Sequence, residues 1–400
     1  MIISTPKLRF KEFTHDWTQG SLHDLLVVSK KRNQGNRYGK DDVFSVSGEF
    51  GIVNQIQFQG RSFAGVSVSN YHIVEHNDIV YTKSPLKANP FGIIKYNPNQ
   101  PGIVSTLYAV YGPKKNTCPK FLDYYFQLDD NVNRYLRPLV HKGPKNDMKI
   151  NNSHVLDGSF YVTSYAEQLR IVNFLTAVDD KITIIANRLA LLQRYKRGVL
   201  QQIFTRQLQF NKDDGIESYP DWTSAPLGEL VDKVGDSFNP VTSKETFRSI
   251  ELESLDQGTG RLLSTFDASG QKSVKTKFKK GDVLFGKLRP YLRKFYYADF
   301  DGVSTSEIWV LRGKLIENAF LYFLVQTEQF NMAANIQSGS KMPRADWGIV
   351  SREVFAIPSI EEQSKIANFL FSIDNKITLE ENMLCRAKDF KKSLLQQIFV

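Results

Sequence analysis

Two stretches of the chain carry apolar residues at alternating spacings of four and three. This spacing is that of an a/d stripe, so each stretch is predicted to be a long helix with one apolar seam. Lys196 interrupts the first seam, and Glu380 and Lys391 interrupt the second. The seam positions are Ile171, Leu175, Val178, Ile182, Ile185, Leu189, Leu192, Val199 and Ile203 in the first stretch, and Ile366, Leu370, Ile373, Ile377, Leu384, Leu394 and Ile398 in the second.

The two stretches are similar in sequence over their whole length. Residues 167–204 read EQLRIVNFLTAVDDKITIIANRLALLQRYKRGVLQQIF, and residues 362–399 read EQSKIANFLFSIDNKITLEENMLCRAKDFKKSLLQQIF. The offset is 195 residues at both ends, from 167 to 362 and from 204 to 399, so no gap is needed. An internal repeat of this length indicates duplication. A helix with one apolar stripe needs a partner, so we expect the copies to pack as an antiparallel coiled coil. The alternative is that each is a core helix of a neighbouring domain.

The segments that precede the two helices also resemble each other. Both contain L-x-F, a tryptophan (Trp17 or Trp222) and two leucines three apart, and HNDIVYTKS at 76–84 parallels KGDVLFGKL at 280–288. Short runs with strand composition follow, and then FLDYYFQ and FLYFLVQ, which are helix-like. We therefore predict an α+β fold: two mixed globular domains and two long helices in a circular pseudo-two-fold repeat. The predicted boundaries are 1–160, 161–206, 207–357 and 358–400.

Composition limits the class of protein. Forty-one per cent hydrophobic residues are enough for real cores, and no stretch approaches the roughly 20 apolar residues of a membrane span. The start lacks a secretory signal, and the two cysteines cannot form a disulfide framework or a four-ligand zinc site. We expect a soluble cytoplasmic protein. The net charge of +10 suggests a polyanionic partner, although a basic protein without such a partner would look the same.

Basic residues beside glycines, amides and aromatics mark candidate DNA-binding loops. Arginine can bind guanine with two hydrogen bonds, lysine holds phosphates, and glycine permits close approach of the backbone. Solvated surface charge is the alternative, and it competes most strongly at SKKRNQGNRYGK, residues 29–40. The candidates are Lys31, Arg32, Arg37, Lys142, Lys145 and Lys149 in the first half, and Lys287, Arg289, Arg293, Lys341 and Arg344 in the second.

The sequence contains no recognisable catalytic motif. It has no G-x-x-x-x-G-K-[ST] phosphate loop, and Asn89-Pro90-Phe91 and Gly258-Thr259-Gly260 are better explained as turns than as methyltransferase motifs. His72 and His76 have metal-ligand spacing only if helical, whereas YHIVEHNDIVY has the composition of strand and turn. We therefore expect no catalytic residue, no metal and no bound cofactor in this chain.

The chain resembles the specificity subunit of Type I restriction–modification systems. The residues that carry the resemblance are EEQSKIANFLFSIDNKI with its terminal LLQQIF, the equivalent helix from Glu167, and GDVLFGKLRPYLRK with DFDGVSTSEIWVL. The resemblance implies a non-catalytic DNA reader, in which each target-recognition domain binds one half of a bipartite site. It also implies that the helices set the gap between the halves and dock two methyltransferase subunits.

The resemblance places the chemistry on partner subunits. S-adenosylmethionine would come with the methyltransferase subunits, and ATP and Mg²⁺ with restriction–translocase subunits in the complete assembly. Two other classes of protein stay open from the residues alone. A two-domain coiled-coil adaptor would show no DNA sequence preference, and a nucleic-acid enzyme with an unrecognised site would act without partners.

Overall fold

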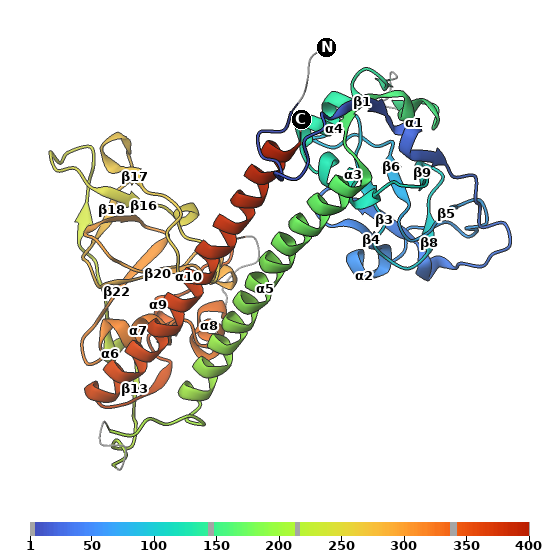
Figure 1. Ribbon diagram of the computed structural model, residues 1–400. Helices are drawn as coiled ribbons and strands as arrows, with labels where there is room; N and C mark the ends of the chain where they lie inside the picture. The colour runs from blue at the N-terminus through green and yellow to red at the C-terminus, as the bar shows by residue number, and fades with distance from the viewer. Residues whose placement is uncertain (1–4, 143–147, 213–216, 337–341, 400) are drawn as a thin grey trace. The chain divides into compact units, whose positions relative to one another are not determined.

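The protein folds into two compact units. The structure is a computed structural model that describes residues 5–142, 148–212, 217–336 and 342–399. Unit 1 comprises Met1–Ile185 with Met383–Val400, and unit 2 comprises Ala186–Asn382. Both units combine helices with sheets (Figure 1), so the α+β prediction is confirmed. The predicted domain boundaries at 160, 206 and 357 stay a prediction, because the structure assigns part of each long helix to each unit.

Unit 1 consists of short strands and helices, joined by the first part of a long helix. Its strands are β1 (Thr18–Ser21), β2 (Leu26–Val28), β3 (Phe44–Ser47), β4 (Gly51–Asn54), β5 (His72–Val74), β6 (Ile79–Thr82), β7 (Ile94–Tyr96), β8 (Gly102–Val104), β9 (Tyr108–Pro113), β10 (His141–Lys142), β11 (Met148–Lys149) and β12 (Ser159–Val162). Its helices are α1 (Leu22–Leu25), α2 (Gln55–Gln59), α3 (Pro119–Phe126), α4 (Asp129–Leu136), the start of α5 (Tyr165–Phe204) and the end of α10 (Ile360–Ile398).

Unit 2 repeats this plan with a larger second sheet. Its strands are β13 (Thr223–Pro226), β14 (Val231–Lys233), β15 (Ser237–Phe238), β16 (Arg248–Ile250), β17 (Phe266–Asp267), β18 (Lys275–Phe278), β19 (Val283–Gly286), β20 (Phe295–Tyr297), β21 (Gly302–Thr305), β22 (Ile308–Gly313) and β23 (Val354–Ile357). Its helices are the end of α5, α6 (Leu227–Leu230), α7 (Asn318–Leu324), α8 (Glu328–Asn335), α9 (Trp347–Val350) and the start of α10. Among the described helices, none combines the length and apolarity that crossing a bilayer requires.

The central sheets of the two units have the same topology. Unit 1 orders its strands β2-β9-β6-β7, and unit 2 orders the corresponding strands β14-β22-β19-β20. The hairpin β6–β7 thus corresponds to β19–β20, and α3 and α4 correspond to α7 and α8. A two-stranded ribbon next to the long helix also repeats, since β1 pairs with β12 as β13 pairs with β23. The weak sequence similarity between the two halves therefore reflects a duplicated fold.

The two long helices begin alike and pair antiparallel. Ser164 and Ser359 lie before their first turns, and each hydroxyl accepts a hydrogen bond from the backbone N–H three residues on. In unit 1, Asp179 near the start of α5 contacts Lys391 near the end of α10 at 2.6 Å. In unit 2, the order is reversed, and Lys196 contacts Asp374 at 2.6 Å. The predicted antiparallel pair is confirmed.

The seam residues are buried most completely where the helices enter the cores. Ile171 and Leu175 belong to the core of unit 1, and Ile366, Leu370 and Ile373 belong to the core of unit 2. The helices are therefore partners of each other and core helices at the same time. At the other ends of the helices, the seam residues Val199, Ile203, Leu394 and Ile398 are also buried, as is Ile185. The remaining predicted seam positions are half-buried: Val178, Ile182, Leu189, Leu192, Ile377 and Leu384.

The repeated LQQIF closes an aromatic cluster in each unit. Phe399 packs against Trp17 and Phe121, with ring centroids 6.4 and 5.3 Å apart. In unit 2 Phe204 occupies the corresponding place, 6.4 Å from Trp222 and 5.2 Å from Phe320. The tryptophans then donate to matching glutamates, Trp17 to Glu167 at 3.4 Å and Trp222 to Glu362 at 3.1 Å.

The repeat is circular in its connections. In unit 2, the backbone N–H of Leu208 donates to the carbonyl of Gln202 at 3.0 Å, just after α5. In unit 1, the N–H of Leu8 donates in the same way to Gln397 at 3.0 Å, at the end of α10. In unit 2 this hydrogen bond joins residues close in sequence, whereas in unit 1 the equivalent bond joins the two ends of the described chain.

Candidate nucleic-acid interface

The β19–β20 loop presents the basic residues predicted in the second half. It is closed by a hydrogen bond from Gly286 N–H to the Lys294 carbonyl at 2.8 Å. Arg289 and Arg293 both have left-handed backbone conformations, with φ of 52° and 48°. Such values are uncommon for residues with a side chain, and they occur where the surrounding structure fixes the turn. Pro290 is buried between them and anchors the loop.

The structure brings the second predicted basic segment against this loop. Leu288 forms an antiparallel bridge with Arg344. The N–H of Arg289 donates to Pro343, and the N–H of Ala345 donates to Lys287, both at 2.8 Å. Two stretches that are distant in sequence therefore form one surface. Lys341 lies outside the described residues.

The basic side chains of this surface differ in their partners. Arg344 binds both carboxylate oxygens of Glu307, at 3.0 and 3.2 Å, and Arg293 pairs with Glu328. Lys287 and Arg289 have neither a hydrogen bond nor an ion pair from their side chains within the described part of the chain. Their charges are therefore not offset by a bound carboxylate, and they are the residues of this surface best placed to meet an added anion.

The candidates in the first half are more scattered. Lys31 pairs with Glu75 at 2.6 Å, Arg32 donates to the Asn70 carbonyl at 2.8 Å, and the Arg37 guanidinium lies 5.4 Å from the ring centroid of Tyr38. Lys142 and Lys149 occupy positions in β10 and β11, which pair with each other, and Lys145 lies outside the described residues. Among the described residues no backbone hydrogen bond or β-bridge joins the segment around Arg32 to β10 or β11.

The sheet topology identifies a loop in unit 1 that the list of candidates omits. The loop between β6 and β7 corresponds to the β19–β20 loop, and it carries Lys83 and Lys87. Burial lowers the pKa of half-buried Lys83. Both loops are tied to the second short helix of their unit: Asn89 donates to Asp129 of α4 at 2.9 Å, as Arg293 pairs with Glu328 of α8. The parallel between HNDIVYTKS and KGDVLFGKL, which aligns Lys83 with Lys287, was the available signal.

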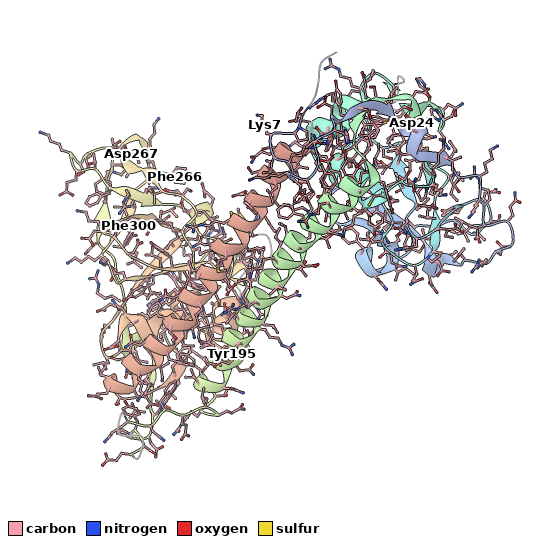
Figure 2. The ribbon with its side chains drawn as sticks, viewed as in Figure 1. Lys7, Asp24, Tyr195, Phe266, Asp267 and Phe300 are labelled. Atoms are coloured by element: carbon pink, nitrogen blue, oxygen red, sulfur yellow. The ribbon has the colours of Figure 1, made fainter. Side chains whose placement is uncertain are left out.

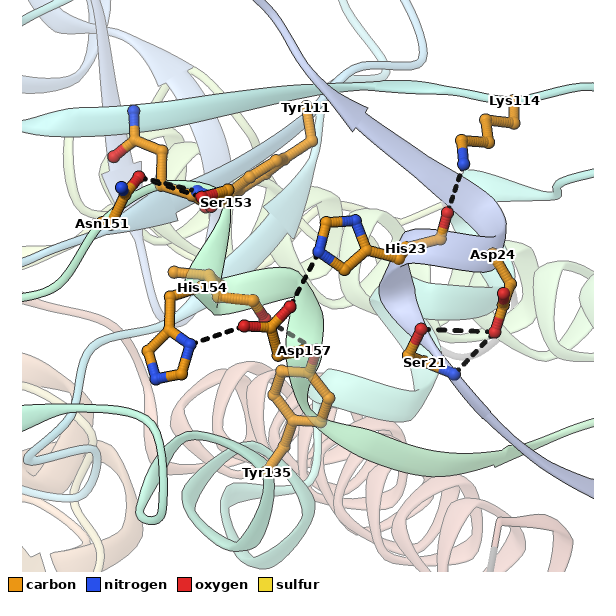
Figure 3. A network of polar contacts seen from close by, with 12 residues as sticks. Ser21, His23, Asp24, Tyr111, Lys114, Tyr135, Asn151, Ser153, His154 and Asp157 are labelled. Carbon is orange, nitrogen blue, oxygen red and sulfur yellow. Dashed lines mark hydrogen bonds and ion pairs between the residues drawn. The ribbon is translucent and has the colours of Figure 1, made fainter.

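Unit 1 also contains a histidine cluster that the sequence did not predict. Asp157 contacts His23 Nε2 at 2.8 Å and His154 Nδ1 at 2.6 Å (Figure 3). The hydrogen bond to His154, with a smaller one to His23, holds the pKa of Asp157 below its usual range. Within the described residues neither ring contacts a hydroxyl or thiol. The cluster joins α1 to the turn before β12 and is best explained as a structural clasp.

His72 and His76 do not share a helical face. His72 lies in β5, where burial lowers its pKa to about 4, and His76 is exposed in the turn that follows. Among the described residues no group of three His, Cys, Asp or Glu side chains has the arrangement of a metal site.

Comparison with known proteins supports the resemblance drawn from the sequence. Residues 221–386 match the family described as Type I restriction modification DNA specificity domain. The chain is 25% identical over 185 residues to the EcoDI specificity subunit of Escherichia coli, covering 44% of this chain and 41% of that protein. It is 21% identical over 249 residues to the MjaVIII specificity subunit of Methanocaldococcus jannaschii, covering 57% of this chain and 58% of that protein. The chain thus spans about half the length of these relatives.

Solved structures extend the similarity of fold over nearly the whole chain. The Type I restriction–modification S subunit from M. genitalium superposes with a TM-score of 0.57 at 13% identity, covering 99% of both chains. A chain from a study of the assembly and conformational transition of a Type I system gives 0.56 at 15% identity, covering 96% of this chain and 97% of that one. The resemblance to Type I specificity subunits is confirmed.

Proposed function

We propose, from the premise that this chain resembles Type I specificity subunits in sequence and in fold, that it is the DNA-reading subunit of a Type I restriction–modification complex. Each globular domain binds one half of a bipartite DNA site. The observation that carries the proposal is the duplicated hairpin loop, β6–β7 in one unit and β19–β20 in the other. A two-part target is matched by two copies of one reading element.

The basic surface of unit 2 supports the assignment to DNA. Lys287 and Arg289 have unpaired charges on a loop whose backbone is held by Arg344 and its neighbours. A rigid loop places a guanidinium at a defined point, which is what recognition of a base edge requires, whereas phosphate contact requires only charge. We assign base contact to this loop.

The two helices set the gap between the half-sites in this proposal. α5 has 40 residues and α10 has 39, and neither is interrupted. At about 1.5 Å per residue each reaches roughly 60 Å. Ion pairs at Asp179–Lys391 and Lys196–Asp374 hold their register, so one helix cannot slide along the other without breaking both. Such a pair acts as a spacer of fixed length.

Exposed apolar residues on the same helices support docking of two identical partners. Ile184 and Tyr195 of α5 are 60% and 53% exposed, and the residues 195 positions later, Leu379 and Phe390 of α10, are 63% and 56% exposed. Figure 2 marks Tyr195 on α5. Each unit thus carries the two exposed apolar residues, one from each helix, at equivalent positions of the repeat. Because the pair occurs once per unit, it fits two copies of one methyltransferase subunit.

The chemistry in this proposal belongs to the partners. The methyltransferase subunits bring S-adenosylmethionine, and restriction–translocase subunits bring ATP and Mg²⁺ to the complete assembly. This chain supplies binding and register without a catalytic group.

A domain exchange tests the proposal. The chain is expressed with its methyltransferase subunits, and modified adenines are mapped in cellular DNA. Replacing residues 207–357 by the equivalent domain of another specificity subunit is expected to change one half-site and leave the other half-site and the gap intact. A complex that binds DNA without any sequence preference would favour the coiled-coil adaptor, and methylation by the partner-free chain would favour an unrecognised enzyme.

A further inference from the structure

Each unit contains a small pocket beside the glutamate in the first turn of its long helix. The pocket of unit 1 has a volume of about 110 Å³, and that of unit 2 about 140 Å³. Both lie between an L-x-F segment, a tryptophan and the glutamate. The corresponding lining residues are Leu8, Arg9, Phe10, Trp17 and Glu167 in unit 1, and Leu208, Gln209, Phe210, Trp222 and Glu362 in unit 2. The pocket is thus repeated with the fold.

The glutamate of unit 1 is engaged by its own chain. Arg9 donates from Nε to Oε1 of Glu167 at 2.8 Å and from Nη2 to Oε2 at 2.9 Å. Trp17 and the Thr163 hydroxyl donate further hydrogen bonds. Burial by itself would raise the pKa of Glu167, but these hydrogen bonds and the charge of Arg9 outweigh burial and hold the pKa below its usual range. A guanidinium is therefore the group that this pocket accepts.

The glutamate of unit 2 is equally buried but has lost these partners. Glu362 is 3% exposed, and within the described residues its carboxylate accepts one side-chain hydrogen bond, from Trp222 at 3.1 Å. Pro358 stands where unit 1 has the threonine, and Gln209 stands where it has the arginine. The duplicated carboxylate is thus buried without the cation for which the fold has a place.

The residues on either side of Gln209 show that it occupies the place of Arg9. The leucine before each donates from its backbone N–H to a glutamine of LQQIF, at 3.0 Å in both units. The phenylalanine after each packs against a phenylalanine of the long helix, with ring centroids 5.8 Å apart in unit 1 and 5.5 Å apart in unit 2. The backbone that presents Arg9 to its glutamate is therefore repeated at Gln209, with a shorter and neutral side chain.

The pocket of unit 2 has a surplus of negative charge. Arg206 also lines it, but the guanidinium forms its ion pair with Asp221 at 2.8 Å. Burial raises the pKa of Glu362, against smaller opposing effects of Trp222 and Arg206. A buried carboxylate without a cation is costly, and aromatic walls such as Tyr219 and Trp222 attract cations. The anionic backbone of DNA is therefore excluded as the occupant.

We infer that this pocket binds an arginine side chain of the methyltransferase subunit, whose guanidinium takes the place that Arg9 has in unit 1. The inference rests on the proposed function and names one contact of that docking. The rim is open to a partner, since Gln209, Pro220 and Asp221 are exposed. The pocket also continues the docking surface of α10, because Ile360, two residues before Glu362, is 47% exposed.

The test measures the affinity of the chain for its methyltransferase subunit. Glu362→Gln keeps an acceptor for Trp222 but removes the charge. We expect the partner to dissociate roughly 30-fold faster, as for the loss of one member of a buried charge pair. Gln209→Arg supplies the guanidinium from within the chain, as in unit 1, so it should fill the pocket and weaken the partner similarly. Gln209→Met, which is uncharged and similar in length, is the matched control and should leave the affinity unchanged.

The stability of the free chain distinguishes a filled pocket from a damaged one. Gln209→Arg should raise the urea midpoint of unfolding, because Glu362 gains the partner that Glu167 has, even though affinity for the methyltransferase falls. A substitution that merely disturbs the fold would lower both. Methylguanidinium added as a competitor should weaken the wild-type complex more than sodium at equal ionic strength, and it should not weaken the Gln209→Arg complex further.

The inference and the proposed function fail in different ways. An unchanged midpoint for Gln209→Arg would show that the pocket does not accept a guanidinium, and a raised midpoint with unchanged affinity would show that no partner arginine uses it. Dimers of the free wild-type chain that Gln209→Arg abolishes would assign the pocket to a second copy of this chain. Each of these results overturns the inference alone. A wild-type complex without any DNA sequence preference would count against the proposed function itself.

Discussion

Lys391 forms an ion pair with Asp179, with 2.6 Å between Nζ and Oδ1, and the duplicated residues Lys196 and Asp374 form the same pair at the same distance. Each lysine also lies over an aromatic ring of its own unit, Lys391 over Tyr124 at 5.4 Å and Lys196 over Phe323 at 5.5 Å. The charges that interrupt the apolar seam are thus the points at which the two helices lock to each other and to the domains.

Removing one lysine should therefore destabilise the helix pair. For Lys391→Ala we expect a loss of about 1–3 kcal/mol in the free energy of unfolding, because half-buried Asp179 loses its cation and keeps only the hydrogen bond from the Tyr124 hydroxyl at 2.7 Å. The double variant Asp179→Leu/Lys391→Leu should recover most of this loss, since two apolar residues extend the seam. Urea unfolding of the single and double variants measures both effects. A single variant as stable as wild type would show that the pair contributes nothing to the lock.

The basic surface at the β19–β20 loop leads to different predictions for combined and for single substitutions. Neutralising Lys287, Arg289, Arg293, Lys341 and Arg344 together should abolish specific binding. Singly, loss of a base contact should cost about 1–3 kcal/mol and relax one position of the target, whereas loss of a phosphate contact should weaken all sequences alike. We expect Arg289→Gln to relax one position. Selection from a randomised half-site library, with Lys115→Gln as control, measures it, and unchanged selection by the five-fold variant would refute the assignment.

The pH dependence of unit 1 should change when one glycine is replaced. Burial raises the pKa of Asp78 to about 6. In unit 2, the corresponding Asp282 receives two hydrogen bonds of 2.7 Å from Arg312, and Gly112 stands where that arginine would be. A Cβ atom added to Gly112 would lie 3.6 Å from Oδ1 of Asp78, an ordinary contact. Gly112→Arg should supply the missing partner and lower the pKa of Asp78.

The sign of this effect is fixed by the raised pKa. In the folded state the carboxyl group of Asp78 keeps its proton up to about pH 6, whereas in the unfolded chain it loses the proton near pH 4. The free energy of unfolding therefore falls as the pH rises between these two values. The full effect is about 3 kcal/mol. Gly112→Arg should remove much of that fall, stabilising the protein more at pH 7 than at pH 4. Unfolding curves across this range test it, with Gly112→Gln as the uncharged control. Equal pH dependence in the two variants would contradict the prediction.

The antiparallel register determines how the spacer should be lengthened. Four residues inserted after Ala190 add about one turn and roughly 6 Å. The same insertion after Cys385, which is 195 residues later, keeps the two helices equal in length. The matched double insertion should lengthen the gap in the DNA target by one or two base pairs, at about 3.4 Å each, with unchanged half-sites. Insertion in α5 alone should shift one ion pair against the other and lower stability. Methylation maps measure the gap, and urea unfolding measures the stability of the single insertion. A constant gap in an active double variant would exclude a ruler.

The sequence predicted the long helices well because their seam depends on local spacing. The same spacing gave no indication of the role of Lys196, Glu380 and Lys391, which it identified only as interruptions of the apolar seam. The structure pairs each of them with a residue of the facing helix, and Glu380 accepts from Arg188 at 2.9 Å. Which charge meets which across two helices depends on their register, and apolar spacing alone does not determine that register.

The basic loops show a second limit of prediction from the sequence. The structure joins Leu288 to Arg344 by a backbone bridge, which charge patterns could not reveal, because strand pairing between distant segments leaves no local signal. In unit 1, the segment around Arg32 is rich in charge, whereas the loop with Lys83 and Lys87 has few charges and no comparable signal of its own. The internal repeat held that information, but only the matching sheet order makes the correspondence certain.

The aromatic cluster that Phe399 closes in unit 1 has a consequence for the order in which the chain folds during synthesis. Residues of unit 2 are contiguous from Ala186 to Asn382, whereas the core of unit 1 is closed by Leu394, Ile398 and Phe399. A ribosome therefore delivers everything unit 2 needs before it delivers the last part of unit 1. Domains generally fold in the order of synthesis, but here the second unit can become compact while the first still exposes Trp17 and Phe121. The N-terminal half is the part that must be protected from aggregation until translation has passed residue 399.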